Sequence, residues 1–419
     1  EIPLRLVGSE MCIRDRNVPI MNETELLANL KDWGTSMKKF LTLTLLAGAA
    51  VLLAACGKLN FDSGSSSTSG TKTGSYQTTG TVDNSMYQGV IKNGRYQTSS
   101  ARGLTLQQND QGENNFNIKS MESGLENLAK AQFPTDKYSF EEGQLLSTAT
   151  AKSWLKREAK DNKDGLNPVD NGKTDPDTRN PIYLQQILEQ DFMVQDGNSM
   201  KLGGIAIALG MNKVDYYTKT EYGAQYQTEI SDEAIKKQGE AIAAKVVARL
   251  RAMSKVPNNI PIIVGIYKNA EQDSLVGGVY TEQTTSKTGT NLGDWKKLDQ
   301  QNEVLPVVSD HKAINSTVAN DFSNFTNQVK GFFPTLAGIT AQAHYEGGNL
   351  AGMNITVNTQ FYGLTEIQSF TQYISTAASK YLPSGVPIEI TIQSTQGMQA
   401  FVSRSSGDKG FYTHVFGSY

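Results

Sequence analysis

Acid–base or metal chemistry has few possible carriers in this chain. The sequence contains three histidines, His311, His344 and His414, and none has a metal-binding residue four positions further on. His344 and Glu346 form the best acid–base pair, because residues two apart on a strand lie on the same face. We predict no catalytic residue and no metal site. The alternative is a hydrolase in which Glu346 and a second carboxylate meet between two halves of the chain.

The acidic segment Asp161–Asp177 invites a calcium-binding interpretation that its spacing does not support. With Gly165 at the sixth position of a calcium loop, Lys160 takes the first position and Asn171 the twelfth, where carboxylates are needed. We therefore expect a solvated loop. The sequence also lacks a phosphate-binding loop, a dinucleotide fingerprint and a nucleophile elbow, so we predict no cofactor.

Cys56 is the residue whose neighbours point to a defined reaction. An apolar run, Phe40–Ala55, precedes it and follows two lysines, which is the pattern of an export signal. The run is shorter than the roughly 20 residues of a membrane-spanning helix. Its end, Leu53-Ala54-Ala55-Cys56, resembles the lipobox of bacterial lipoproteins. The resemblance implies that a diacylglyceryl group is attached to the Cys56 thiol, and that a signal peptidase recognises Leu53, Ala54 and Ala55 and cuts before Cys56. A buried cysteine in an apolar helix is the alternative.

The segments around Cys56 indicate where the protein is expected to work. An export signal acts from a free N-terminus, so we take Met37 as the native start, residues 1–36 as non-native upstream sequence and residues 37–55 as the signal peptide. Residues 56–85 are rich in Ser, Thr and Gly and are expected to form a disordered linker. Because two acyl chains anchor a protein stably, we predict a protein of the cell membrane that faces the extracellular side and the cell wall.

The charge balance excludes nucleic acid as a partner. The chain of 419 residues has 39 basic and 42 acidic side chains and a formal net charge of −3. It therefore offers no basic field that could neutralise a phosphate backbone. Its two cysteines, Cys12 and Cys56, are too few for a disulfide framework. The folded part must therefore be stabilised by packing.

Two stretches of the chain repeat one order of elements, which indicates an internal duplication. Each has an apolar strand, an amphipathic helix, a Pro-x-x-x-Pro turn and a second strand. The first copy comprises Gly204–Leu209, Ser231–Lys255 and Ile262–Tyr267; the second comprises Met353–Val357, Thr365–Tyr381 and Ile388–Ile392. A further partner strand is expected around Leu275-Val276 in the first copy and around Phe401-Val402 in the second.

We therefore predict an α+β fold of two related halves, residues 86–285 and 293–419, with a boundary in or just after the polar segment Thr281–Leu292. Each half is expected to be a mostly antiparallel sheet with a packed helix, a strand-helix-strand-strand unit. Thr365 and Gln368 form a capping-box pattern. Additional helices are expected over Glu122–Phe133 and Phe322–Phe333.

The two copies differ in the connection from the first strand to the helix. This connection is longer in the first copy and carries four tyrosines: Tyr216, Tyr217, Tyr222 and Tyr226. Long loops in compact domains are often functional, and tyrosine rings give rigid amphipathic contact area suited to glycans or peptides. We predict a ligand-binding site there. The alternative is that the rings pack over the sheet edge as part of the core.

With the lipobox, the linker and the two halves, the chain resembles the CamS family of sex-pheromone precursor lipoproteins from Gram-positive bacteria. The most recognisable stretches are Ser153-Trp154-Leu155-Lys156-Arg157, Lys160-Asp161-Asn162 and Gly165-Leu166-Asn167-Pro168. The resemblance implies that a short apolar peptide within Ala49–Ala55 is released from the signal and acts as a mating pheromone. It leaves the role of the mature domains open. We expect them to be non-enzymatic and to bind a peptide, a glycan or a protein.

Overall fold

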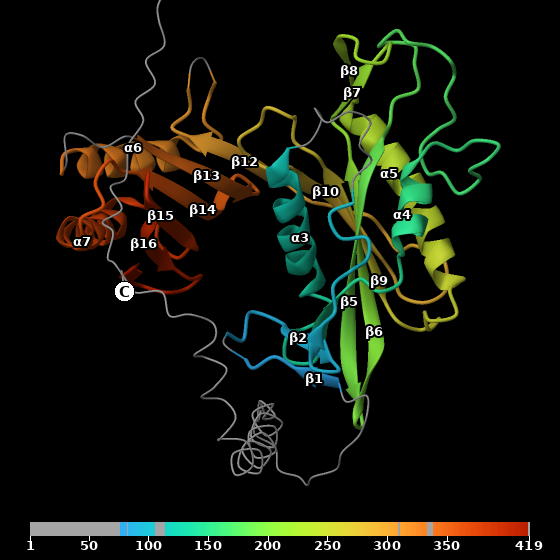
Figure 1. Cartoon of the computed structure of the whole chain (residues 1–419), viewed down its shortest axis with the longest axis horizontal. Helices are drawn as coiled ribbons and strands as arrows, with labels where there is room; N and C mark the ends of the chain where they lie inside the picture. Colours follow the sequence, from blue (N-terminus) through green and yellow to red (C-terminus); the bar gives the residue numbers. More distant parts are fainter. Residues whose placement is uncertain (1–75, 82, 105–113, 309–310, 333–337, 418–419) are drawn as a thin grey trace, which may run out of the picture. The chain divides into compact units, whose positions relative to one another are not determined.

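The computed structural model describes residues 76–81, 83–104, 114–308, 311–332 and 338–417. They lie in one unit, Thr68–Tyr419, and form a mixed α+β fold (Figure 1). The described helices are α3 (Asn115–Ala129), α4 (Thr148–Leu155), α5 (Asp232–Arg251), α6 (Ser316–Lys330) and α7 (Leu364–Tyr381). None of them is long and apolar enough to cross a membrane. Residues 1–36, the signal segment 37–55 and the lipobox residues Leu53, Ala54, Ala55 and Cys56 lie outside the described residues.

The first sheet runs in the order β1-β2-β4-β5-β6-β9-β10-β11, with β3 paired to β2. Its strands are β1 (Tyr76–Thr78), β2 (Gln88–Lys92), β3 (Arg95–Tyr96), β4 (Ser139–Glu142), β5 (Leu184–Asp196), β6 (Ser199–Met211), β9 (Ile262–Lys268), β10 (Val279–Ser286) and β11 (Lys296–Lys297). From β4 to β11 every pair is antiparallel except β6 with β9. Helix α5 lies in the chain between these two parallel strands, which need a long crossover connection.

The second sheet repeats this arrangement. Its strands are β12 (Gln300–Leu305), β13 (Gly338–Glu346), β14 (Asn349–Asn358), β15 (Ile388–Ser394), β16 (Gly397–Arg404) and β17 (Tyr412–Val415), paired in that order. Only β14 and β15 are parallel, and α7 connects them. Each half also has a further helix: α4 lies in the chain between β4 and β5, and α6 lies between β12 and β13. The predicted α+β fold with two related halves is therefore confirmed, and the repeat is longer than the predicted strand-helix-strand-strand unit.

The second proline of each Pro-x-x-x-Pro turn accepts the same kind of hydrogen bond in both halves. The carbonyl of Pro261 accepts a 3.1 Å hydrogen bond from the amide of Ile205, and the carbonyl of Pro387 accepts a 3.1 Å bond from the amide of Met353. Each second proline thus stands just before the parallel strand and supplies the first bond of its ladder. Proline has no backbone N–H to donate to a β-ladder, and at this position, just before the strand, no donor is needed.

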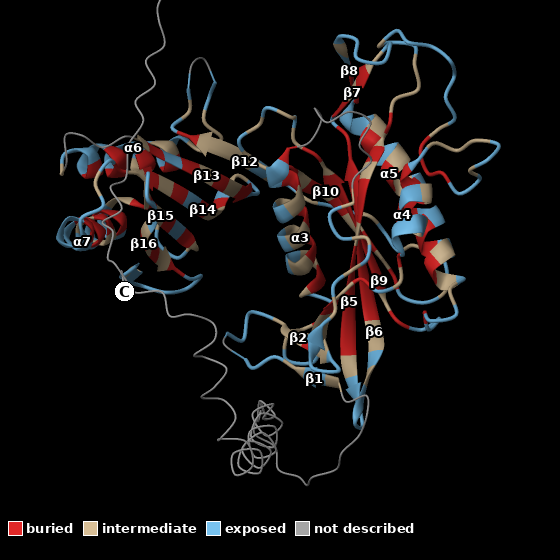
Figure 2. Ribbon diagram, in the orientation of Figure 1, coloured by how far each residue is buried: buried red, intermediate tan, exposed pale blue. Residues whose placement is uncertain are grey.

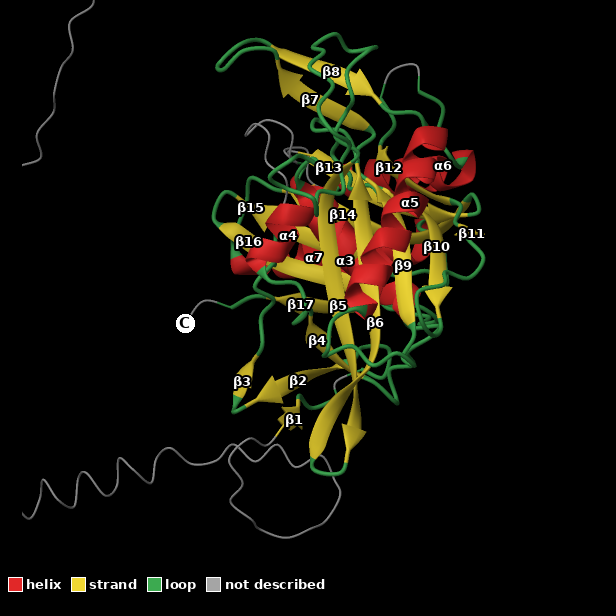
Figure 3. Cartoon of the chain, turned by 90° about the vertical axis from the view of Figure 1, so that its right-hand side faces the viewer, coloured by secondary structure: helices red, strands yellow, loops and turns green. Residues whose placement is uncertain are grey.

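The two sheets bury their faces differently (Figure 2). One core packs α4 and α5 against the face of the first sheet that carries Ile205 and Ile207, and a second core packs α3 against the opposite face, which carries Ala206 and Ala208. Figure 3 shows α4 and α5 lying over the strands of that sheet. The second sheet has one core, in which α6 and α7 cover a single face. Its other face carries mostly polar side chains on β14 and β15, such as Asn354, Thr356 and Thr391, and aromatic rings toward β17.

The start of α5 agrees with the predicted helix Ser231–Lys255, whereas its end comes earlier, at Arg251, and the start of α7 differs in its cap. Ser231 caps α5 by accepting a 3.2 Å hydrogen bond from the amide of Ala234, and acidic residues follow in the first turn. Helix α7 starts at Leu364, and its cap, Gly363, makes no side-chain hydrogen bond. The capping box predicted for Thr365 and Gln368 is therefore wrong, because Thr365 already lies inside the first turn.

Three other local predictions need correction. Leu275 and Val276 lie in the loop before β10 rather than in a strand, since the Asn114 side-chain amide binds the carbonyls of Ser274 (2.8 Å) and Val276 (3.3 Å). The segment Thr281–Leu292 is only partly a connector, because its first residues belong to β10. The folded part also begins before residue 86, because Tyr76–Thr78 of the segment predicted as linker form β1, which pairs with β2.

Candidate functional site

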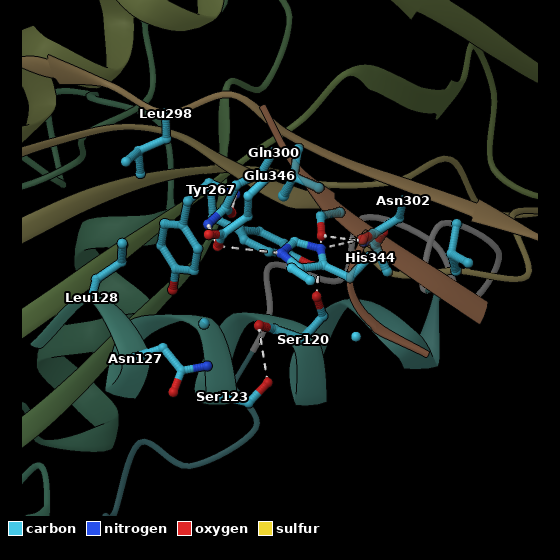
Figure 4. A pocket seen from close by; sticks show the side chains of 18 of the residues that line it. Ser120, Ser123, Asn127, Leu128, Tyr267, Leu298, Gln300, Asn302, His344 and Glu346 are labelled. Carbon is cyan, nitrogen blue, oxygen red and sulfur yellow. Dashed lines mark hydrogen bonds and ion pairs between the residues drawn. The ribbon is translucent and has the colours of Figure 1, made fainter. Parts of the chain in front are cut away.

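A cleft of about 1030 Å³ has walls from both halves (Figure 4). The first half contributes one side of α3, the end of β9 and the start of β10 with the loop before it. The second half contributes β13, β14 and the start of β15. Leu298 and Asp299, between β11 and β12, also line it, as do Gln300 and Asn302 of β12. The cleft is therefore built at the junction of the two related halves.

Helix α3 presents a polar side to the cleft because its apolar side is used by the first sheet. Met121, Leu125 and Ala129 are buried against the sheet, whereas Ser120 and Asn127 line the cleft. This spacing is that of an amphipathic helix. The helix was expected over Glu122–Phe133, and it begins earlier because Asn114 caps it.

Tyr280 fixes the distance between α3 and the sheet. Its ring lies between Gly124 of α3 and Gly265 of β9, and a Cβ atom at either glycine would come within 2.6 or 2.7 Å of the ring. Its hydroxyl donates a 2.6 Å hydrogen bond to the carbonyl of Met121. Burial raises the pKa of this phenol well above 10.0, so Tyr280 stays a neutral donor under the rear wall of the cleft.

Asn302 joins the two halves at the cleft. Its side-chain nitrogen donates to the carbonyls of Gly277 (2.8 Å) and Gly278 (3.0 Å) in the first half. Its oxygen must then be an acceptor, so the His344 Nδ1 that lies 2.6 Å away carries the proton. Burial lowers the pKa of His344 from 6.5, and the nearby Glu346 carboxylate opposes that shift. At neutral pH the ring therefore presents an unprotonated Nε2.

Glu346 lies in the cleft, as the hydrolase alternative requires. Its Oε1 is 3.6 Å from Nε2 of His344 and accepts a 3.2 Å hydrogen bond from the side chain of Gln300. A glycoside hydrolase of the usual kind needs a second carboxylate across the substrate. The side-chain contacts of Glu346 are an imidazole and an amide, and two further carboxylates, Asp299 and Glu389, also line the cleft. His311 and His414 are exposed and lie outside the cleft.

The four tyrosines of the predicted binding loop do not line the cleft. They lie on or beside a separate hairpin of β7 (Val214–Thr218) and β8 (Gln225–Glu229). Tyr217 is buried under the guanidinium of Arg179, which lies 3.8 Å from the ring centre and pairs with Asp215 at 2.6 Å. Tyr226 lies 5.8 Å from Tyr217, ring centre to ring centre.

The other two tyrosines point to no common site with these. Tyr222 is 97% exposed between the two strands, and Tyr216 is half-buried and precedes Tyr217, so it lies on the opposite face of β7. The alternative, that rings are part of the core, describes Tyr217. The ligand site predicted from all four tyrosines stays a prediction.

The most recognisable sequence stretch forms a structural loop. Asn167 is buried and its side chain bonds the carbonyls of Leu155 (2.7 Å) and Leu184 (2.8 Å). The Asn162 side chain bonds the carbonyls of Ser153 and Arg157 in the same way. Gly165 is needed because a Cβ there would lie 2.3 Å from the Arg157 backbone. Among the described residues no cluster of His, Cys, Asp or Glu could hold a metal ion.

The sequence reasoning missed the polar side chains that line the cleft. They include several amides from α3, β10, β12, β13 and β14: Asn127, Gln283, Gln300, Asn302, Gln342 and Asn354. One signal for them was present, since Asn354 breaks the apolar pattern of a strand whose counterpart in the first half is apolar throughout. That signal marks an open sheet face, but it does not identify what lies opposite.

Comparison with known proteins places this fold in a family. Residues 96–410 match the family described as CamS sex pheromone cAM373 precursor. A sex pheromone precursor from Lactobacillus salivarius subsp. salivarius is 48% identical and superposes with a TM-score of 0.78, covering 82% of this chain and 100% of that one. The C-terminal domain of the sex pheromone staph-cAM373 precursor from Staphylococcus aureus is 28% identical, with a TM-score of 0.63, covering 73% of this chain and 98% of that one. No curated protein gave a match. The chain belongs to the CamS sex pheromone precursor family.

Proposed function

We propose that this chain is a lipid-anchored surface protein whose folded part is a binding module, with the ligand site in the cleft between its halves. The observation that carries the proposal is the cleft itself, because its walls come from both halves and its lining is rich in polar side chains. Sites for small or extended ligands are commonly concave and lie at such junctions. The hairpin of β7 and β8 is less suitable, since of its two neighbouring rings, Tyr217 and Tyr226, Tyr217 is buried.

Thiol protection tests this role in cells. Gln283 lines the cleft from β10 and its side chain has no hydrogen-bond partner among the described residues, so Gln283→Cys should fold normally. In a background with Cys12→Ser, we expect a maleimide to label Gln283→Cys in the purified full chain but much more slowly in intact cells, where a ligand occupies the cleft. Tyr222→Cys is the matched control and should react alike in both, after correction for access through the envelope. Equal labelling at both positions would reject the cleft.

The anchor is proposed to be a diacylglyceryl group on Cys56, followed by cleavage after Ala55. Metabolic labelling with an alkyne fatty acid should mark the wild-type chain, and Cys56→Ala should abolish both the label and sedimentation with membranes. Cys12→Ala should change neither. Retention of the fatty acid by Cys56→Ala would contradict the anchor.

The pheromone role is proposed from the family. The relatives are described as sex pheromone precursors, and in this chain the peptide would lie within Ala49–Ala55. Its small apolar residues suit release from a signal, although it has no aromatic residue or isoleucine. A synthetic Ala49–Ala55 peptide should induce aggregation of a responsive donor strain. Failure in every responsive strain would remove this part of the proposal.

A hydrolase is the second candidate because Glu346 and His344 meet in the cleft at 3.6 Å. We propose binding without catalysis, so the purified full chain should leave no cleared band on a gel that contains cell-wall substrate. A cleared band from the wild type that is lost in Glu346→Gln would reverse this choice.

A further inference from the structure

Charges of opposite sign balance in the cleft. Three lysines and three carboxylates line it: Lys119, Lys296, Lys297, Asp299, Glu346 and Glu389. A polyanion or a polycation is recognised by a surface of one sign, because like charges add to one field. The balance in this cleft therefore favours a ligand without net charge.

Two amides in the cleft are free to bind such a ligand. Gln283 on β10 and Asn354 on β14 face the cleft, and neither side chain has a hydrogen-bond partner within the described ranges. An amide side chain offers two donor hydrogens and an acceptor oxygen. This mixture matches hydroxyl groups, which also donate and accept, better than it matches a carboxylate or an ammonium group.

The lining of the cleft continues onto the open face of the second sheet. Asn354 pairs in register with Glu389, Glu389 with Ser403, and Ser403 with Tyr412. The next row on the same face runs from Thr356 through Thr391, Phe401 and His414. Three strand spacings separate Asn354 from Tyr412, or about 14 Å. The surface is therefore long enough for several units of a chain and too long for one small molecule.

Aromatic rings stand at the far end of this face. Phe401 is 5.8 Å from Tyr412 and 5.6 Å from His414, ring centre to ring centre, and Phe416 is 5.0 Å from His414. Tyr412 is 62% exposed and Phe416 is 44% exposed. Exposed rings on a sheet of polar side chains give an apolar platform with a polar border, and its rings are tilted against one another by 37° to 81°. The C–H face of a sugar ring packs on such a platform while its hydroxyls reach the border.

We propose that the cleft and the adjoining open sheet face bind a neutral polysaccharide chain, an inference that rests on the binding role proposed above. A peptide fits this surface less well. An extended peptide gains affinity by pairing its backbone with a free strand edge, whereas the middle of this surface, β13 to β16, is paired on both sides and offers only side chains; the edges of the sheet are β12 and β17. Charge balance, free amides and the aromatic platform are together the chemistry of a sugar-binding surface.

Titration of the full chain in detergent micelles tests the ligand class. The probes are chitohexaose and cellohexaose as neutral sugars, an uncharged hexapeptide of Ala, Gly and Ser, and a heparin hexasaccharide as polyanion. We expect at least one neutral sugar to bind, and Asn354→Ala and Tyr412→Ala each to weaken that binding about tenfold, which corresponds to one good contact. Tyr222→Ala, which removes an equally accessible ring from the hairpin, should bind as the wild type does. Unchanged melting curves should accompany all three variants.

The outcomes separate the ligand class from the binding role. Binding of the hexapeptide or heparin without either neutral sugar would overturn the polysaccharide, and so would failure of all four probes. If Gln283→Cys is still protected in cells, the cleft keeps its binding role with another ligand. Sugar binding that Tyr222→Ala abolishes and Asn354→Ala leaves intact would move the site to the hairpin and overturn both proposals.

Discussion

The two halves share one strand order and one pair of parallel strands, but they treat the faces of their sheets differently. In the first half, Ala206 and Ala208 are fully buried under α3. In the second half the strand registers place Asn354 and Thr356 at the same points, and these side chains face the cleft or the open surface. Both halves bury the other face of these strands. The comparison teaches that a duplicated sheet gains room for a ligand where one copy has no helix packed on its second face.

The same alignment identifies a second position at which the covered face and the open face carry different side chains. Phe192 corresponds to His344, because each pairs with a glycine, Gly204 or Gly352, just before the parallel ladder. Phe192 is fully buried, and the side chain of His344 is 37% exposed. The covered face thus carries a phenyl ring where the open face carries an imidazole.

The largest expected effect comes from exchanging residues between the two faces. Ala206→Asn places an unpaired amide under α3 and should lower the free energy of unfolding by about 3 kcal/mol. The reciprocal Asn354→Ala removes an exposed side chain and should change it by less than about 0.5 kcal/mol. Denaturant unfolding measures both. Equal losses would show that the second face is also covered.

A smaller effect is expected at the arginines that hold the proline turns. Arg251 donates to the carbonyls of Pro257 (2.8 Å) and Ile260 (2.7 Å), and also to Gly289 (2.7 Å). Arg404 holds the second turn through the carbonyls of Pro383 and Val386. Arg251→Ala should cost about 2 kcal/mol and Arg404→Ala somewhat less, since bonds to a charged donor are strong and Arg251 makes more of them. Thermal unfolding ranks the two, and a reversed ranking would contradict this reading of the turns.

Much of this comparison could be predicted from the sequence. The run Ile205-Ala206-Ile207-Ala208-Leu209 is apolar throughout, which is typical of a strand buried on both faces. Met353-Asn354-Ile355-Thr356-Val357 alternates, which is typical of a strand with one open face. The paired helices and proline turns then indicate the duplication. Periodicity carries this information because it depends only on neighbours in the chain.

The cleft could not be predicted because it depends on contacts between distant residues. Asn302 meets Gly277 and Gly278, and His344 meets Asn302, across two sheets that no local pattern relates. The loop at Leu275-Val276 resembled a strand because its residues are apolar, while the Asn114 amide that holds it belongs to another element. Tyr217 was singled out by its type, and only the fold reveals the Arg179 guanidinium over its ring.

The two halves also differ in buried carboxyl groups, which should make the stability of the first half depend on pH. Glu189 and Asp191 on β5 are buried, where the second half has Ala341 and Ala343. Burial raises the pKa of both carboxyls, that of Asp191 well above 3.8. The folded state therefore holds a proton that the unfolded state releases, and stability is lost as the pH rises through the folded pKa.

Asp191→Asn mimics the protonated carboxyl and tests that sign. The variant should match the wild type in acid and become progressively more stable than it as the pH rises. Unfolding measured from about pH 5 to about pH 8 follows the difference. Asp196→Asn, at the exposed end of β5, is the control and should show no such trend. A deficit for Asp191→Asn at high pH would mean that the carboxylate is charged in the folded protein.

The smallest expected effect concerns His344, the open-face counterpart of Phe192. Burial lowers the pKa of His344 from 6.5, so the stability contributed by the neutral ring is present above that value and is lost as the pH falls toward the folded pKa. Nuclear magnetic resonance of the ring protons should give a midpoint below 6.5, with His414→Asn used for assignment. Glu346→Gln should lower the midpoint further, because it removes the carboxylate that favours the imidazolium. A midpoint above 6.5 would show that the Glu346 charge outweighs burial, and the open face would then carry a cation beside the ligand where the covered face carries a phenyl ring.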